Sequence, residues 1–181
     1  QYTGDTRPPE LLSARLDVDH AHVSLTFNEV INPALSNLAG IFLRRDAWGG
    51  AKTSLNTSTV TTSVLSTVLN VSVSVADLNR VKQLRFATAA DVTVEVEQDA
   101  VTDASGNGIS PTAVIPLTTL SADSESPVLV SADLDLTRER LLVTFDEIVR
   151  ADELVLAGIS LRSNKHAPDG DAVYLGLDST S

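Results

Sequence analysis

The chain has 181 residues, the length of one large domain or two small ones. Its 13 Lys and Arg stand against 24 Asp and Glu, and the resulting formal net charge of −11 would repel nucleic acid and anionic lipid. Cys and Met are absent, which excludes disulfides, Cys-ligated metal centres and Cys nucleophiles, and no apolar run approaches the ~20 residues of a membrane span.

The first predicted elements are short β-strands. Leu12, Ala14 and Leu16 alternate with polar neighbours and predict a strand with one buried face. The run at 23–27 is rich in β-branched and aromatic residues and predicts a second strand. A further strand is expected to begin at Ile41.

One short helix interrupts the strands. Leu78, Val81 and Leu84 stand at helical spacing, and Ser74 or Asp77 is available as the N-cap. This pattern predicts a single helical segment in the first two thirds of the chain.

The later elements are again strands. Segments 70–75 and 92–97 alternate with a period of two, so each is expected to present one face to a core. The segment at 103–108 contains two glycines and predicts a turn. The segment at 113–117 is the expected closing strand, and Pro116 predicts that it lies at a sheet edge. About seven short strands in about 118 residues predict an all-β fold, an antiparallel sandwich.

The chain contains an internal repeat. The segment that begins at Pro9 aligns without a gap with the segment that begins at Pro127, at a spacing of about 118 residues, and about 15 of 36 positions are identical. The identical pairs include Ser13 with Ser131, Ala14 with Ala132, Thr26-Phe27 with Thr144-Phe145, and Glu29 with Glu147. The chain is therefore expected to hold one repeat and part of a second.

The repeat sets the predicted domain boundaries. The first repeat covers 1–122, with its core from about Asp5, and the second starts at Asp123 and is cut off at Ser181. Strands that lack partners expose backbone donors and acceptors, so either the rest of a longer protein or another chain must complete the second repeat. The missing initiator Met and the absence of a signal sequence at Gln1 predict a processed or excised piece.

Four motifs follow one another along the chain: Pro-x-Leu-x-Ser-Ala-x-Leu-Asp at 9–17, Leu-Thr-Phe-Asn-Glu at 25–29, Asp-Leu-Asn-Arg-Val-Lys at 77–82 and Val-Thr-Asp-Ala-Ser-Gly-Asn at 101–107. Their order resembles tandem immunoglobulin-like repeats, of bacterial Ig-like or cadherin-like type, from large extracellular surface or filament proteins. The resemblance implies Ig-like β-sandwiches in tandem, each with one short helix. It also implies an extracellular or cell-surface location, a rod-forming adhesive or structural role and, in some members, calcium at the domain junctions.

Acidic and amide side chains near the predicted strand ends form a candidate calcium site, since Ca²⁺ takes six to eight oxygen ligands. The candidate ligands are Asp17, Glu29, Asp103, Asn107, Asp123 and Glu125. The alternative interpretation is solvated carboxylates together with structural ion pairs. The candidate pairs are Glu29 with Arg44 and Glu147 with Arg162, whose members recur in both copies.

The segment 52–74 is rich in Ser and Thr and contains two N-glycosylation sequons, at Asn56 and Asn70. A polar strand face is the alternative explanation. If the chain is secreted by a eukaryotic cell, we expect at least one sequon to carry glycan. Asn56, near a predicted strand end, is the better placed.

Histidine and tryptophan give weaker signals. His20 and His22 could lie on one face of a strand, but the repeat places Arg138 and Arg140 at the matching positions, and Arg is not a metal ligand here. We therefore expect exposed polar positions in both copies. Trp48 is expected to fold over the end of the sandwich, with an exposed contact residue as the alternative.

These features predict a non-enzymatic structural or adhesive module of a large extracellular surface or filament-forming glycoprotein. Its expected partners are neighbouring repeats of the same chain, other copies or surface and matrix proteins, and glycans, while nucleic acid and membrane insertion of this segment are not expected. Calcium is the one cofactor that the sequence brings into consideration. The alternatives are a calcium-dependent adhesion module and a carbohydrate-binding or carbohydrate-active domain, which would need a cleft lined by carboxylates and aromatic rings.

Overall fold

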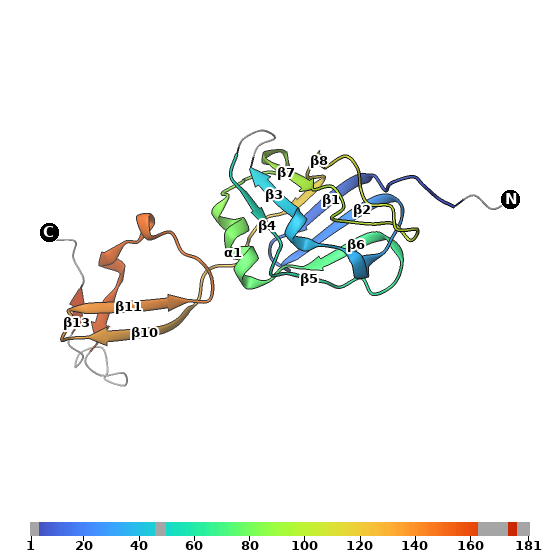
Figure 1. Ribbon diagram of the computed structural model, residues 1–181. Coiled ribbons are helices and arrows are strands. Elements are labelled where there is room, and N and C mark those ends of the chain that lie inside the picture. The colour runs from blue at the N-terminus through green and yellow to red at the C-terminus, as the bar shows by residue number, and fades with distance from the viewer. Residues whose placement is uncertain (1–3, 46–49, 163–173, 177–181) are drawn as a thin grey trace. The chain divides into compact units, whose positions relative to one another are not determined.

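The computed structural model of the chain describes residues 4–45, 50–162 and 174–176. The chain divides into two compact units, 1–147 and 148–181. Most of the described elements are β-strands, and α1 is the one α-helix among them. The predicted all-β class is therefore confirmed (Figure 1).

The first unit contains a five-stranded sheet in the order β5-β6-β2-β1-β9. Its strands are β1 (Leu11–Asp17), β2 (His22–Ile31), β5 (Thr59–Val60), β6 (Ser66–Ser72) and β9 (Thr119–Ser121). Neighbouring strands are antiparallel except for β1 and β9, which run parallel. The expectation of a purely antiparallel fold is therefore wrong at this edge, because a three-residue strand joins β1 after a long excursion of the chain.

The second sheet of this unit has four antiparallel strands in the order β4-β3-β7-β8. Its strands are β3 (Ile41–Arg45), β4 (Lys52–Ser54), β7 (Val92–Val96) and β8 (Ala113–Pro116). β8 lies at the edge, as Pro116 predicts, since proline donates no hydrogen bond to a sheet.

Both sheets contribute to one hydrophobic core. β2 buries Val23 and Leu25, while β3 buries Ile41 and Leu43 with no exposed surface. β7 adds the side chains of residues 92, 94 and 96. This arrangement is sandwich-like, because each sheet turns its apolar face to the same core.

A β-bulge changes the predicted alternation in β1. The pairing register with β2 shifts between Leu11 and Ser13. As a result Leu11 is 8% exposed and Leu12 is 59% exposed, so the expected inward position of Leu12 is wrong. Ala14 and Leu16 are buried as expected. A bulge adds one residue to a strand, so the side chains before it point to the opposite face from the one that simple alternation predicts.

The helix α1 (Val75–Gln83) is close to the predicted segment. Ser74 caps it, since its side chain accepts a 3.1 Å hydrogen bond from the backbone N–H of Asp77. Val81 is fully buried and Leu78 packs against the core. In Figure 1 the helix lies at one end of the two sheets, and the N-terminal segment lies at the opposite end.

β7 is buried on both faces, whereas its alternation predicted one buried face. Thr93 and Glu95, which alternate with the core valines, are 7% and 8% exposed. Glu95 is covered because the side chains of Arg44 and Lys52, from β3 and β4, both bind its carboxylate.

The hairpin of β10 (Leu129–Asp135) and β11 (Arg140–Phe145) copies the hairpin of β1 and β2. Every pair from Leu11↔Phe27 to Asp17↔His22 has its counterpart from Leu129↔Phe145 to Asp135↔Arg140. Both hairpins shift register at the same point. The sequence repeat is therefore also a repeat of backbone pairing.

The second unit repeats the next elements of the first unit in the same order. Two 3₁₀ turns, η4 (Ala151–Glu153) and η5 (Leu156–Gly158), come before β12 (Ser160–Arg162), which pairs antiparallel with β13 (Tyr174–Gly176). In the first unit η1 (Pro33–Leu35) and η2 (Leu38–Gly40) come before β3 in the same way.

Candidate functional site

Three carboxylates meet at the end of the first sandwich that carries the N-terminal segment. One oxygen atom from each of Asp5, Glu29 and Asp103 lies within 4.8 Å of the other two. Glu29 comes from β2, Asp103 from the turn that follows β7, and Asp5 from the segment before β1. Two of the predicted calcium ligands, Glu29 and Asp103, are thus brought together, and Asp5 joins them.

Asp103 is held by its own turn. Its Oδ1 atom accepts hydrogen bonds from the backbone N–H groups of Ser105, at 2.8 Å, and Asn107, at 2.7 Å. The side chain is 1% exposed. Burial alone would raise the pKa of Asp103, but these hydrogen bonds outweigh it and hold the pKa below its ordinary value. Gly106 adopts a φ of 93° in this turn, which suits glycine.

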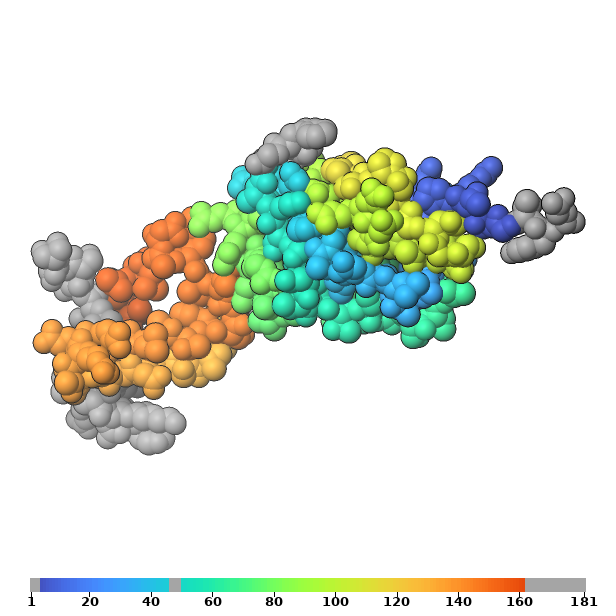
Figure 2. Space-filling view, viewed as in Figure 1, coloured from blue at the N-terminus to red at the C-terminus, as the bar shows by residue number. Residues whose placement is uncertain are grey.

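Asn107, a third predicted ligand, connects the turn to the N-terminal segment. Its Nδ2 atom donates to Asp103 Oδ2 at 2.7 Å and to the backbone carbonyl of Asp5 at 3.2 Å. Figure 2 shows the yellow-green surface of this turn lying beside the dark blue surface of the N-terminal segment. Three hydrogen bonds therefore occupy three of the about four acceptor sites of the Asp103 carboxylate, and Oδ2 keeps one for a further ligand.

Glu29 lies in an unfavourable electrostatic position. Partial burial raises the pKa of its carboxyl, and the neighbouring charges of Asp5 and Asp103 raise it further. Among the described ion pairs none includes Glu29. A positive charge placed beside Glu29 would therefore stabilise its ionised carboxylate.

The structure gives Arg44 a different partner from the predicted Glu29. Arg44 binds the carboxylate of Glu95, to which Lys52 Nζ also binds at 3.1 Å. β3 and β7 are direct neighbours, and this adjacency brings the side chains of Arg44 and Glu95 together, whereas Glu29 lies with Asp5 and Asp103. Lys52 also lies over the ring of Phe42, 3.9 Å from its centre.

The other predicted ligands lie apart from the three-carboxylate cluster. Asp17 accepts a 3.0 Å hydrogen bond from the backbone N–H of His20, which lowers the pKa of the Asp17 carboxyl. Asp123 binds Lys82, and Glu125 is exposed. One calcium site that includes all six predicted ligands is therefore not formed.

Lys82 is a site residue that the sequence analysis did not identify. From α1 its Nζ atom binds Glu147 and also Asp123, the latter at 2.9 Å. Lys82 is 14% exposed and Glu147 is 15% exposed. Burial alone would lower the pKa of Lys82, but the hydrogen bonds and charges of the two carboxylates outweigh it and raise the pKa.

The Lys82 ion pair borders a small hollow of about 120 Å³. The apolar side chains around it are Val18, Val81, Phe86, Leu120 and Ala122. The low exposure of both charged partners makes the ion pair less sensitive to screening by solvent than a surface pair. The predicted partner of Glu147 was Arg162, whose side chain lies outside the described residues.

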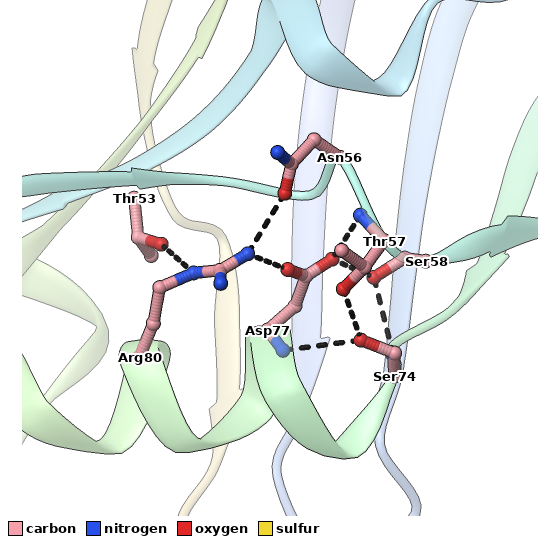
Figure 3. Close-up of polar contacts among 7 residues, drawn as sticks. All are labelled: Thr53, Asn56, Thr57, Ser58, Ser74, Asp77 and Arg80. Carbon is pink, nitrogen blue, oxygen red and sulfur yellow. Dashed lines mark hydrogen bonds and ion pairs between the residues drawn. The ribbon is translucent and has the colours of Figure 1, made fainter.

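The two sequons differ in their surroundings. Asn56 is exposed in the loop after β4, where its Oδ1 atom accepts a 2.8 Å hydrogen bond from Arg80. Figure 3 shows this loop held above α1 by Asp77 and Arg80. Asn70 lies within β6, half-buried, and accepts a 2.7 Å hydrogen bond from the Ser24 hydroxyl.

The two histidines of the first hairpin contact different side chains. His20 is on the turn before β2 and contacts Asp17, while His22 begins β2 and lies 3.5 Å from the Ser24 hydroxyl. Trp48 lies outside the described residues. Within the described part of the chain, no helix has both the length and the apolar character needed to cross a membrane.

No protein-family model matches this chain, and no curated protein matches it. Two solved structures are similar to it in part. The crystal structure of the S-layer protein rSbsC(31-844) is 16% identical with a TM-score of 0.38, and the match covers 76% of this chain and 18% of that one. The crystal structure of the N-terminal part of the bacterial S-layer protein SbsC is 15% identical with a TM-score of 0.39, covering 94% and 38%.

Proposed function

We propose that the chain is a non-enzymatic structural module of a large extracellular surface or filament-forming protein built from tandem Ig-like sandwiches. The observation that carries this proposal is the repeat of hydrogen bonds at a constant offset along the chain. The backbone N–H of Glu10 donates to Asn28 Oδ1 at 2.8 Å, and the N–H of Val128 donates to Asp146 Oδ1 at 2.8 Å. A chain in which one folding unit is followed by a second copy of the same pattern is typical of spacer and filament proteins.

The turns of the two hairpins extend the correspondence. Asp17 Oδ1 accepts from the N–H of His20 at 3.0 Å, and Asp135 Oδ1 accepts from the N–H of Arg138 at 3.0 Å. The residues that follow, Ala21 and Glu139, both have a positive φ, of 49° and 52°. The shared aspartate explains the common hydrogen bond, and the common backbone shape is kept although the other side chains of the turn differ.

The partners that follow from this proposal are neighbouring repeats of the same chain, other copies or surface and matrix proteins, and glycans attached at the sequons. A carbohydrate-binding or carbohydrate-active role has less support. The hollow beside Lys82 is about 120 Å³, with Phe86 as its one aromatic lining residue. Ligand sites are typically about 300–1,000 Å³ and apolar or aromatic in lining.

A calcium-dependent adhesion module is the other alternative, and the cluster of Asp5, Glu29 and Asp103 is the feature that favours it. Ca²⁺ takes six to eight oxygen ligands, whereas this cluster brings together one oxygen from each of three carboxylates, and Asp103 already accepts three hydrogen bonds. We therefore propose that the module is stable without calcium. Thermal melting in excess chelator and in millimolar CaCl₂ tests this: equal midpoints support it, and a rise of several degrees with calcium contradicts it.

The structural role is tested on the native protein. Intact cells of the source organism are treated with a protease, and an antibody raised against this chain follows the full-length protein. Loss of the signal, with a cytoplasmic marker retained, supports the surface location. The sequence of the full-length protein gives the second readout. Further copies at a period near 118 residues support the tandem array, and a single isolated copy contradicts it.

A further inference from the structure

The two copies of the repeat present the same pair of carboxylates. Asp5 and Glu29 in the first copy correspond to Asp123 and Glu147 in the second, at the same constant offset. The backbone beside each glutamate is also the same. The N–H of Asn28 donates to the carbonyl of Glu10 at 3.0 Å, and the N–H of Asp146 donates to that of Val128 at 3.1 Å.

In the second copy this pair binds a lysine. The Nζ atom of Lys82, from the helix of the preceding repeat, binds Asp123 at 2.9 Å and also binds Glu147. The lysine is 14% exposed and lies beside an apolar hollow, so the contact is largely shielded from water. An ammonium held by two carboxylates is a charge-assisted arrangement.

In the first copy the corresponding pair has no lysine among the described residues. Glu29 has Asp5 and Asp103 beside it, three carboxylates within 4.8 Å. Partial burial and these like charges raise the pKa of the Glu29 carboxyl. The chain therefore contains the same carboxylate pair twice, once bound to a lysine and once beside a third carboxylate.

We propose that Asp5 and Glu29 form the receiving half of a repeat-to-repeat ion pair, whose donor is a lysine at the Lys82 position of a preceding repeat. This inference rests on the proposed tandem function. The donor and the receiving pair lie at opposite ends of the first repeat, because α1 is at one end of its sheets and the N-terminal segment is at the other (Figure 1). A head-to-tail contact of this kind propagates along an array without limit.

The experiment inserts a second copy of residues 5–122 directly after Ala122 of the full chain. The inserted Asp5 then follows Ala122 as Asp123 does in the parent chain. A water-soluble carbodiimide, used with a chelator present to remove divalent ions, couples a lysine amine to a contacting carboxylate as an amide. The monomer is isolated by gel filtration, digested and analysed by mass spectrometry.

The expected product links Lys82 of the first copy to Glu29 or Asp5 of the inserted copy. The link between Lys82 of the inserted copy and Glu147 or Asp123 is the internal reference. Lys82→Arg in the first copy alone keeps the positive charge but removes the reactive amine, so it should abolish the first product and leave the reference. If the reference forms without the first product, the inference is overturned while the proposed tandem function stands.

A stability readout does not depend on the coupling chemistry. In the parent chain Glu29→Gln removes like-charge repulsion and is expected to raise the melting temperature at neutral pH. In the inserted copy the same substitution removes a lysine partner and is expected to lower it. A rise in both proteins would overturn the inference.

Discussion

The Asp77 carboxylate, fully buried in the first turn of α1, accepts a 2.5 Å hydrogen bond from the Ser58 hydroxyl. It also accepts a 3.0 Å hydrogen bond from the backbone N–H of Thr57 and binds Arg80 one turn further along the helix. Ser74, the N-cap of the same helix, lies 2.6 Å from the Thr57 hydroxyl. Figure 3 shows these groups joining the loop after β4 to the start of α1.

Asp77→Asn is expected to destabilise the fold by about 2–4 kcal/mol, because one amide NH₂ replaces an acceptor oxygen and would face a donor group. The urea midpoint, followed by circular dichroism at neutral pH, measures the loss. Asp133→Asn, at an exposed position of β10, is the control and should change stability by less than about 0.5 kcal/mol. Equal midpoints for the two variants would show that the buried carboxylate does not stabilise the loop.

The sequon at Asn56 is expected to carry glycan when the chain is secreted from a eukaryotic host, and the sequon at Asn70 is not. Asn56 is exposed in a loop, while the Asn70 side chain is half-buried within β6 and bonded to Ser24. Intact-mass analysis before and after enzymatic removal of glycans, on the parent chain and on Asn56→Gln and Asn70→Gln, measures this. A mass shift that survives Asn56→Gln, or no shift in the parent, contradicts the prediction.

Glu29→Gln is expected to stabilise this chain at neutral pH and to have no effect in acid. Partial burial raises the pKa of Glu29, as do the charges of Asp5 and Asp103. Arg7 opposes this shift in part, and Glu10 adds a smaller increase. With its pKa raised in the folded state, the ionised carboxyl disfavours folding above its ordinary pKa. The penalty disappears as the pH falls through the folded pKa to the ordinary range, where the group is protonated in both states.

Urea midpoints of Glu29→Gln and of the parent chain between pH 3 and pH 8 test this sign. The urea midpoint of the variant should be higher than that of the parent chain at neutral pH, and the two midpoints should be nearly equal at the acid end. Glu125→Gln removes the same charge at an exposed position and is the control. A variant that is less stable than the parent at pH 7 would mean that Glu29 has a favourable cationic partner in this chain.

Features that depend on local periodicity could be predicted from the sequence. The helix follows from Leu78, Val81 and the Ser74 cap, all within one short segment, and the structure confirms it. The outward position of Leu12 could not be predicted, because the bulge is defined by the pairing of β1 with β2. The parallel strand β9 was missed for a similar reason, since three residues carry too little periodicity to identify a strand.

Part of the candidate site could likewise be predicted from the sequence, and part could not. The repeat marked Glu29 and Glu147 as equivalent positions, and the turn composition pointed to Asp103 and Asn107. Lys82 was missed because its partner Glu147 lies 65 residues away along the chain. A lysine near the end of a helix is ordinarily explained by the helix dipole alone, so only the folded chain identifies its carboxylate partners.

The Leu-Ala-Gly-Ile motif, present in both copies, supplies a matched pair of glycines. A Cβ atom at Gly40 would lie 2.9 Å from the Cβ atom of Ala100, while a Cβ atom at Gly158 would meet nothing within 4 Å. Both glycines end a 3₁₀ turn. Glycine at position 40 therefore permits the close approach of the segment that contains Ala100, which is 3% exposed.

Gly40→Ala is expected to lower stability by about 1–3 kcal/mol, because the added methyl group overpacks a buried contact. Gly158→Ala is expected to change it by less than about 1 kcal/mol, and any change should be a gain from the stiffer unfolded chain. Because the two glycines lie in different compact units, each variant is compared with the parent chain, and the loss of urea midpoint in Gly40→Ala measures the Ala100 contact. Equal midpoints would show that the first sandwich absorbs the methyl group by moving the segment 97–100, and that the glycine is not required for packing.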